Sequence, residues 1–291
     1  MTEGREWGRA NSENSKYMHT HIVDGKKIRD KLQEELKAEI LTRSILPTLV
    51  LFYVGTNPVI DTFVRLKKKF GGEIGIPVDI KTFPDTISED ELIIEIKRAC
   101  TPLTGIVVQL PLPKHINQEN VTNSVPVEYD VDVLSSYSFS KLEKGTSKVL
   151  PPVIGAIREI VKYHDIDFKD KHVVIIGKGK LVGEPAMLWL RSLGIVPTVL
   201  TRSSTDFFEQ VKKADVLITG AGTPRLISKD MVKAGAVLID AGTSESEARI
   251  VGDIDPEASL VASIFTPVPG GIGPITIAVL FKNLFILTED I

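Results

Sequence analysis

Several features are scarce in this sequence, and each scarcity excludes a class of protein. The 291 residues contain one cysteine, Cys100, so the chain has no intrachain disulfide and no cysteine-based zinc site, as is usual in a reducing cytoplasm. No apolar run has the length of a membrane span, and the polar segment 1–19 lacks the apolar stretch of a secretory signal. We therefore expect a cytoplasmic protein without a membrane partner, in which residues 1–19 form a disordered tail.

An excess of charge of one sign is also missing. The 35 Lys and Arg residues nearly balance the 38 Asp and Glu residues, which leaves a net charge of -3. This balance argues against nucleic acid or an anionic membrane as a partner, so a small-molecule ligand is favoured. The content of 43% hydrophobic residues, with 22 Gly and 17 Pro, is ordinary for a globular protein, and the length suits two domains.

The first half of the sequence alternates helix and strand patterns. Apolar residues recur at helical spacing over 28–40, and a continuous apolar run at 48–55 ends in glycine, as in a strand buried on both faces. A helix is predicted to begin near Pro58, and shorter strands are predicted at 78–83 and 105–113 with a helix between them. This alternation is typical of a parallel sheet.

The second half contains four apolar strand patterns that each end in glycine or small polar residues. The predicted fold class is therefore α/β with two domains, an N-terminal α/β domain with a parallel-rich sheet and a Rossmann-like dinucleotide-binding domain, with a cleft between them. An apolar helix follows the last strand pattern, and we expect it to return to the first domain. The predicted division assigns 20–150 and 272–291 to the first domain and 151–271 to the second.

A glycine turn, GKGKLVG at 177–183, follows the first strand of the second half and leads into a helix. Backbone N–H groups and the positive helix end can hold phosphates in such a turn, although its GxGxxxG spacing is not the standard fingerprint and the glycines could be turn residues only. The next strand ends in Arg202 and Ser203, where an NAD enzyme usually carries an acidic residue. A cation suits a phosphate, so NADP is favoured over NAD unless these cations are merely solvated. The candidate cofactor-binding residues are Gly177, Lys178, Gly179, Gly183, Arg202, Ser203, Ala221, Gly222 and Thr243.

One candidate catalytic residue, Lys67, lies in a basic run at 65–69 that would ordinarily be a solvated helix face. Phe63 is one helical turn away, beside a strand-end loop, so an aromatic ring and an amine would share one wall of a cleft. A lysine in a partly dry cleft has a lowered pKa and can serve as acid or base.

Two further candidates follow predicted strands. Gln109 stands at the end of an apolar strand, where a lone amide needs partners and where parallel sheets bind ligands. Asp130 and Asp132 alternate, so in an extended segment they would face the same way and could accept hydrogen bonds from a ligand. No third metal ligand is grouped with them, and we expect no metal site.

Taken together, these residues resemble the bifunctional methylenetetrahydrofolate dehydrogenase and methenyltetrahydrofolate cyclohydrolase family. The resemblance extends from about Ile22 to the C-terminus, and its most specific segments are GIVVQLPLP at 105–113 and TPVPGGIGPIT at 266–276. Shorter matches are IVDGK at 22–26, YVGTNP at 53–58, FVRLKKK at 63–69, DVD at 130–132, LVGEP at 181–185, and AGAVLIDAG and GDID before the final loop.

The resemblance implies a role for each matching residue. Lys67 would be the acid or base of water addition and ring opening, Gln109 would orient it, and Asp132 would anchor the pterin. The resemblance also implies tetrahydrofolate derivatives as substrates, NADP as cofactor, a place in one-carbon metabolism and purine biosynthesis, and a homodimer. The residues implied to line the folate cleft are Phe63, Pro269, Gly270, Gly273, Pro274 and Thr276.

Several positions depart from the family pattern. The family tyrosine is Phe63 here, the serine three residues earlier is Ile60, and the glycine after DVD is Val133. The family's Pro-Cys-Thr-Pro stretch reads PPVI at 151–154, and its Gly-Arg-Ser turn reads Gly-Lys-Gly at 177–179. Three alternatives to the bifunctional enzyme therefore stay open: a dehydrogenase with weak or lost cyclohydrolase activity, a catalytically decayed folate- or nucleotide-binding protein, and an NADP dehydrogenase of another small substrate.

Overall fold

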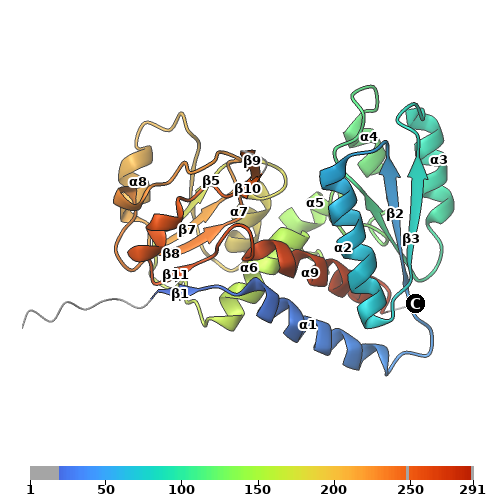
Figure 1. Ribbon diagram of the computed structural model, residues 1–291, viewed down its shortest axis with the longest axis horizontal. Helices are drawn as coiled ribbons and strands as arrows, with labels where there is room; N and C mark the ends of the chain where they lie inside the picture. Colours follow the sequence, from blue (N-terminus) through green and yellow to red (C-terminus); the bar gives the residue numbers. More distant parts are fainter. Residues whose placement is uncertain (1–19, 247–248, 290–291) are drawn as a thin grey trace, which may run out of the picture.

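The computed structural model describes residues 20–246 and 249–289, which form two lobes with helices between them (Figure 1). Each lobe contains a parallel sheet, in the strand order β3-β2-β4 in the first lobe and β1-β11-β8-β7-β5-β6 in the second. The predicted α/β class with two domains, the second Rossmann-like, is confirmed. The predicted tail, 1–19, lies outside the described residues.

The first lobe has a sheet that is covered on both faces. Its strands are β2 (Thr48–Val54), β3 (Val78–Phe83) and β4 (Thr104–Val108). Alternate residues of β2 pack into two different hydrophobic clusters, which explains why the predicted run is apolar throughout. On one face lie α2 (Pro58–Ile74) and α9 (Ile272–Leu287), and on the other lie α3 (Glu89–Ala99) and α4 (Gln118–Asn123).

The second lobe contains the four predicted strands, β5 (Val173–Ile176), β6 (Thr198–Leu200), β7 (Val216–Thr219) and β8 (Val237–Asp240). On one face lie α6 (Pro152–Tyr163) and α7 (Gly183–Ser192). On the other lie α8 (Phe207–Lys213) and the short helices η1 (Lys229–Met231) and η2 (Pro256–Leu260). The chain turns from β5 to the edge strand β6 and then back to β7 on the opposite side of β5, so the carboxyl ends of β5 and β7 flank the switch point at which such sheets bind ligands.

Two short strands and a hairpin were not predicted. Strand β11 (Ile264–Phe265) pairs with β8, and β1 (His21–Ile22) pairs with β11. The start of the described chain therefore belongs to the second sheet, although the predicted division places residue 20 onward in the first domain. The hairpin is formed by β9 (Ser244–Ser246) and β10 (Arg249–Val251).

Helix α9 connects the two lobes. It is apolar on nearly every side and packs against α2, α6 and α1 (Gly25–Ile40), as the expected return of the last helix requires (Figure 1). The approach to α6 is close, because a Cβ added at Gly155 would lie 2.4 Å from Val279 Cγ1. None of the helices in residues 20–246 and 249–289 combines the length and the apolar character that a membrane crossing requires.

Candidate active site

The centre of the candidate site is a contact between Lys67 on α2 and Gln109, the residue that follows β4. The Lys67 ammonium donates a hydrogen bond to Gln109 Oε1 over 2.8 Å. The Gln109 amide nitrogen donates to the carbonyl oxygen of Leu110 at 3.1 Å, which fixes the orientation of the amide and turns its oxygen toward the lysine. The two segments are 42 residues apart in the sequence, so the contact depends on the fold.

Burial shifts the pKa of both charged groups in this site. It lowers the pKa of the Lys67 amine, and the Asp132 carboxylate partly opposes this effect. Burial also raises the pKa of Asp132, while Lys67 lowers it and the charge of Asp130 raises it further. The pKa of each group is thus displaced toward the neutral form, and the charge of the other group opposes this displacement only in part.

The two alternating aspartates do not face the same way, and that expectation is wrong. The chain turns at residues 131–132 rather than staying extended, and Asp130 is directed into the protein. Its carboxylate accepts hydrogen bonds from the backbone N–H of Ser135 at 2.9 Å and from Ser138 Oγ at 2.7 Å. Asp130 therefore holds the start of α5 (Ser136–Glu143), and Asp132 alone remains beside Lys67.

A buried amide on α9 holds the segment that carries Asp132. Asn283 donates to the backbone oxygens of Val131 at 2.9 Å and Leu150 at 2.8 Å. Gly105 in β4 makes room for this packing, because a Cβ there would lie 2.5 Å from Val131 Cγ1. We did not predict Asn283 as a site residue, although an isolated amide in an apolar helix was the signal that could have indicated it.

Another unpredicted residue, Tyr53, fixes the start of α2. Its hydroxyl donates to Asp61 Oδ1 at 2.7 Å and accepts from the backbone N–H of Asn57 at 2.6 Å. The tyrosine is almost fully buried at the end of β2. The helix that presents Phe63 and Lys67 is thereby tied to the sheet by its first turn.

The proline and glycine loop before α9 contacts the start of α1. The backbone N–H of Gly25 donates to the oxygen of Gly270 at 3.0 Å, and a Cβ at Gly25 would lie 1.7 Å from the oxygen of Gly271. The IVDGK and TPVPGG segments, far apart in the sequence, therefore form one structure at the edge of the second sheet. Of the predicted folate-lining residues, Pro269 and Gly270 of this loop and Gly273 at the start of α9 are exposed, and Pro274 and Thr276 of α9 are half-buried.

The glycine turn after β5 has the predicted strand, turn and helix context, since β5 ends at Ile176 and α7 begins at Gly183. A Cβ at Gly183 would lie 2.1 Å from the oxygen of Gly177, and a Cβ at Gly177 would lie 2.6 Å from the oxygen of Gly220. These two glycines are therefore required by close backbone packing, whereas the space around Gly179 is open.

The other predicted cofactor contacts lie at the carboxyl ends of neighbouring strands. Lys178, Arg202 and Ser203 are exposed just after β5 and β6, and this set of donors fits phosphate groups. Three more residues follow β7 and β8 along the same edge: Ala221, Gly222 and Thr243. The fold thus gathers all the predicted nucleotide contacts at one edge of the second sheet.

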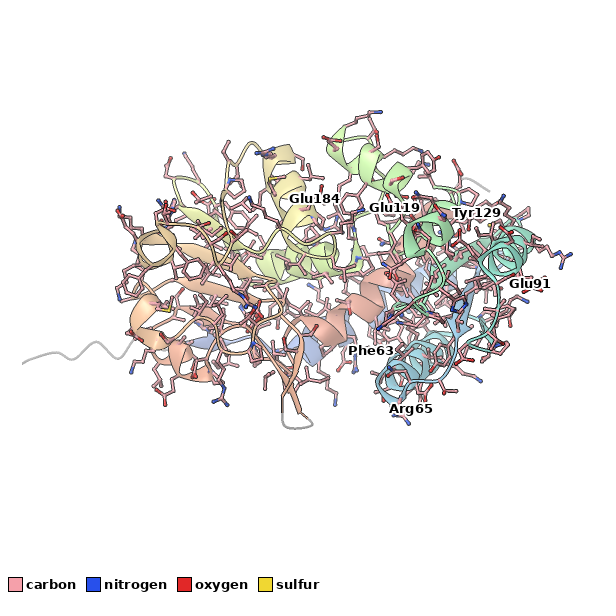
Figure 2. The ribbon with its side chains drawn as sticks, turned by 90° about the horizontal axis from the view of Figure 1, so that it is seen from above. Phe63, Arg65, Glu91, Glu119, Tyr129 and Glu184 are labelled. Atoms are coloured by element: carbon pink, nitrogen blue, oxygen red, sulfur yellow. The ribbon has the colours of Figure 1, made fainter. Side chains whose placement is uncertain are left out.

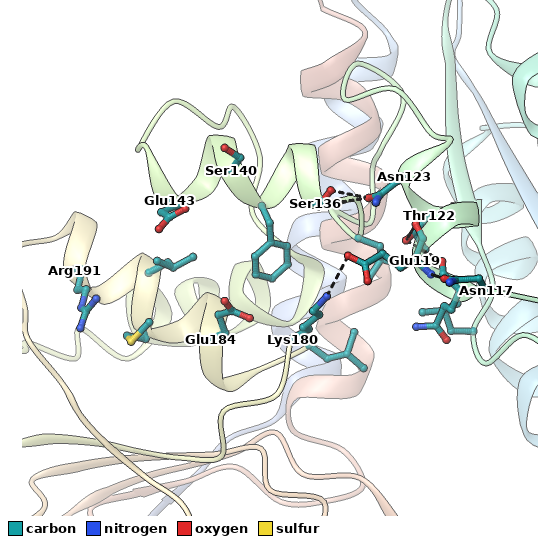
Figure 3. Close-up of a pocket in the computed structure, with 17 residues that line it drawn as sticks. Asn117, Glu119, Thr122, Asn123, Ser136, Ser140, Glu143, Lys180, Glu184 and Arg191 are labelled. Atoms are coloured by element: carbon teal, nitrogen blue, oxygen red, sulfur yellow. Dashed lines mark hydrogen bonds and ion pairs between the residues drawn. The ribbon is translucent and has the colours of Figure 1, made fainter.

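A cavity of about 580 Å³ lies between the lobes (Figure 3). Leu110, next to Gln109, lines it from the first lobe, and Lys180 and Leu181 of the glycine turn line it from the second. Lys180 approaches Glu119 of α4 at 3.8 Å and so links the two lobes (Figure 3). The cavity connects the Gln109 strand end with the glycine turn, although Lys67 does not line it.

Phe63 is on the side of α2 that faces the second lobe, as Figure 2 shows, and its side chain is 41% exposed. Arg65, two residues later, is exposed and lies at the outer edge of the molecule (Figure 2). The aromatic ring is therefore available to a ligand between the lobes, while part of the basic run is an ordinary solvated helix face.

The fold and the site define a two-domain α/β enzyme with a Rossmann-like lobe for a dinucleotide and a half-buried amine in the other lobe. Comparison with known proteins gives the family. The model of the tetrahydrofolate dehydrogenase/cyclohydrolase catalytic domain matches residues 23–132, and that of the corresponding NAD(P)-binding domain matches residues 151–290. The chain belongs to the tetrahydrofolate dehydrogenase/cyclohydrolase family, as its sequence motifs predict.

Individual relatives are similar to this chain along nearly its whole length. The bifunctional protein FolD of Nitrosospira multiformis is 37% identical over 94% of this chain and 97% of its own. The crystal structure of the bifunctional FolD of Campylobacter jejuni superposes with a TM-score of 0.89 at 33% identity, covering 94% of this chain and 99% of that one. A Trypanosoma brucei FolD structure, complexed with NADP and an inhibitor, has a TM-score of 0.87 at 27% identity over 93% and 98% of the two chains.

Proposed function

We propose that one site between the lobes oxidises methylene-tetrahydrofolate to methenyl-tetrahydrofolate with NADP and hydrolyses the product to formyl-tetrahydrofolate. Family membership over both domains supports this pair of reactions. The observation that carries the hydrolytic half is the contact between the Lys67 amine and the Gln109 amide in a partly buried site.

Lys67 serves the hydrolysis in this proposal. Water must lose a proton as it adds to the methenyl carbon, and the ring nitrogen that leaves must gain one. A neutral amine can accept the first proton and return it to the nitrogen, and burial favours that neutral form. Gln109 accepts a hydrogen bond from the amine and so keeps it directed at the reacting carbon, while Asp132 accepts hydrogen bonds from the N–H groups of the pterin.

The second lobe serves the oxidation. Bound NADP would supply the acceptor for the hydride that leaves the methylene carbon. The turn at 177–183 supplies backbone N–H groups and Lys178 to the phosphates, and Arg202 and Ser203 bind the additional phosphate that distinguishes NADP from NAD. Hydride transfer mainly requires that the methylene carbon is aligned with the carbon of NADP that accepts the hydride, and a fixed gap between the two lobes provides this alignment.

The substrate lies between Phe63 and the proline and glycine loop in this proposal. The exposed face of the Phe63 ring stacks on the aromatic part of the folate. On the opposite wall are Pro269 and Gly270 of the loop and, from the start of α9, Gly273, Pro274 and Thr276.

A dehydrogenase with reduced cyclohydrolase activity is the second candidate. It is favoured by the ring at Phe63, which has no hydroxyl where the family pattern has a tyrosine, and by the apolar Ile60 one turn earlier.

We assign the chain to one-carbon metabolism and purine biosynthesis in the cytoplasm, as a homodimer that binds neither nucleic acid nor membranes. We place the domain division at 20–150 with 272–291 and at 151–271, except that β1 pairs within the second sheet.

Two assays on the wild-type enzyme and on Lys67→Met test the proposal. Formation of NADPH from methylene-tetrahydrofolate reports the oxidation, and decay of the methenyl absorbance reports the hydrolysis. We expect both signals from the wild type, and we expect Lys67→Met to lose hydrolysis by about a hundredfold or more while it still forms NADPH. Unchanged hydrolysis in Lys67→Met would remove the lysine from this role, and the absence of both wild-type signals would favour a binding protein.

A further inference from the structure

Two buried carboxylates in the second lobe take no part in the chemistry described so far. Asp240 is the last residue of β8, and Asp253 lies just beyond β10; their exposed fractions are 1% and 0%. In the part of the chain that the structure describes, neither carboxylate forms an ion pair with lysine or arginine. Buried charges without a counter-charge are costly, so the groups that satisfy them indicate what they do.

Asp253 holds the turn that follows β7. Its Oδ2 accepts a hydrogen bond from the backbone N–H of Ala221 at 2.6 Å, and its Oδ1 accepts one from the N–H of Thr223 at 2.7 Å. These two N–H groups flank Gly222, so the carboxylate fixes both sides of a turn that contains two predicted nucleotide contacts. The turn itself is at the edge of the sheet, just after β7.

Asp240 holds a second set of backbone groups. Its Oδ1 accepts from the N–H of Gly242 at 2.9 Å and of Asp253 at 3.1 Å, and its Oδ2 accepts from the N–H of Ile254 at 2.8 Å. The hydroxyl of Thr219, at the end of β7, also donates to Oδ1 at 3.1 Å. Asp240 thus connects the ends of β7 and β8 to the segment that carries Asp253.

The same network reaches the folate side of the site. The backbone N–H of Asp240 donates to Thr266 Oγ1 at 2.6 Å, and Thr266 is the first residue of the segment that continues into the proline and glycine loop. A single buried cluster therefore contacts the turn after β7, the turn after β8 and the segment after β11.

The carboxylates of Asp240 and Asp253 pack closely against the backbone of two glycines. A Cβ at Gly242 would lie 2.2 Å from Asp253 Cγ, and a Cβ at Gly252 would lie 2.1 Å from Asp240 Oδ2. Both glycines belong to the AGAVLIDAG and GDID matches, so this packing explains segments that the proposed function leaves without a role. Burial and the neighbouring Asp253 raise the pKa of Asp240 to about 6, and the backbone N–H groups of the cluster oppose that rise.

We propose that Asp240 and Asp253 are positioning residues of the dinucleotide site, which hold the strand-end turns in their binding arrangement before the cofactor arrives. The inference rests on the proposed function, since it assigns these turns to the cofactor. The two carboxylates have separable contacts: that of Asp253 fixes the turn after β7, whereas that of Asp240 fixes the turn after β8 and the segment that carries Asp253.

The test compares Asp253→Asn and Asp240→Asn with the wild type. An asparagine has one acceptor oxygen and presents its NH₂ group to the backbone N–H on the other side, so each variant loses part of the hydrogen bonding that holds its turn. For Asp253→Asn we expect the Kd for NADP, measured by calorimetry, to rise about tenfold. We also expect faster hydrogen exchange at the amides of Ala221 and Thr223. Hydrolysis of methenyl-tetrahydrofolate needs no nucleotide, and in Asp253→Asn it should stay within about twofold of the wild type.

Asp240→Asn should also weaken NADP binding, because its carboxylate holds the turn after β8 and the backbone N–H of Asp253. Hydrolysis should stay within about twofold of the wild type, because residue 240 contacts Thr266 through its backbone N–H, which the substitution keeps. The matched control is Asp255→Asn, two residues beyond Asp253, where the carboxylate also accepts from a backbone N–H, that of Glu257 at 2.9 Å. This control should change neither quantity. An unchanged Kd together with unchanged exchange at Ala221 and Thr223 in Asp253→Asn would overturn the proposal.

If the Asn variants do not fold, hydrogen exchange in the wild type still tests whether the turns are held before NADP binds. Turns that are held in advance have protected amides at Ala221 and Thr223 without NADP, and protection that appears only after NADP is added would contradict the inference. If the wild type does not bind NADP at all, the proposed function fails, while protected amides would still show that the carboxylates hold the turns.

Discussion

The two halves of the candidate site are built in different ways. In the first lobe, Lys67, Gln109 and Asp132 come from three separate segments, and their side chains meet at one hydrogen bond and a charge interaction. In the second lobe the site is mainly backbone, held by glycine contacts and buried carboxylates. The chemistry of the first half can therefore change by single side-chain substitutions, whereas the second half depends on backbone positions that tolerate few changes.

The departures from the family pattern agree with this difference. Phe63 is exposed on α2, so the missing hydroxyl alters chemistry and not packing, whereas Ile60 replaces a polar residue at a position that is buried in the core of the first lobe. In the glycine turn, the first and last glycines, Gly177 and Gly183, are the ones that close contacts require, and only the residues between them differ.

A substitution in the second lobe, where the candidate site is mainly backbone, gives the larger of the two effects that we predict here. In Gly183→Ala the new Cβ would lie 2.1 Å from the oxygen of Gly177, so the turn must shift. We expect a loss of about 1–3 kcal/mol in the free energy of unfolding and at least a tenfold rise in the Kd for NADP. Chemical denaturation and calorimetry measure the two quantities.

The control for that variant is Gly72→Ala on α2, where a Cβ would meet nothing within 4 Å and alanine favours the helix. It should leave NADP binding unchanged and stabilise the protein slightly. Wild-type affinity for NADP in Gly183→Ala would contradict the view that this turn is fixed by close backbone packing.

A substitution in the first lobe, where side chains form the candidate site, should have a smaller effect, and it should increase activity. Phe63→Tyr restores the hydroxyl of the family pattern at a position that is 41% exposed, so packing is not disturbed. One added hydrogen bond to substrate or water corresponds to an increase of about two- to tenfold in the kcat/KM of hydrolysis. Oxidation should change less. A decrease in hydrolysis would contradict the view that Phe63 takes the place of the family tyrosine and lacks only its hydroxyl.

Much of the fold could be predicted because its signals are local. The apolar runs of β2 and β5 and the start of α2 at Pro58 follow from short-range patterns, and the structure has them at nearly the predicted positions. Strands β1 and β11 were missed because two residues each are too short for any periodic pattern, and they exist only through pairing with a distant neighbour.

The site residues divide in the same way. Gln109 could be proposed from its place at a strand end, and Lys67 from its helix position beside Phe63 together with the family resemblance; the structure brings these two side chains into contact. The orientation of Asp130 could not, because it depends on a turn and on hydroxyl partners in α5 that alternation does not reveal. Asn283 and Asp253 were missed because their functions are hydrogen bonds to backbone groups that are remote in the sequence.

The central claim is that the Lys67 amine is displaced toward its neutral form, and an NMR titration of its Nζ in labelled protein tests this most directly. Burial lowers the pKa of Lys67 from 10.5, and the base form therefore increases as the pH rises through a value below 10.5. We predict a Lys67 titration below that of the exposed lysines, with the hydrolysis rate rising over the same pH range. A Lys67 resonance that titrates with the exposed lysines would contradict the account.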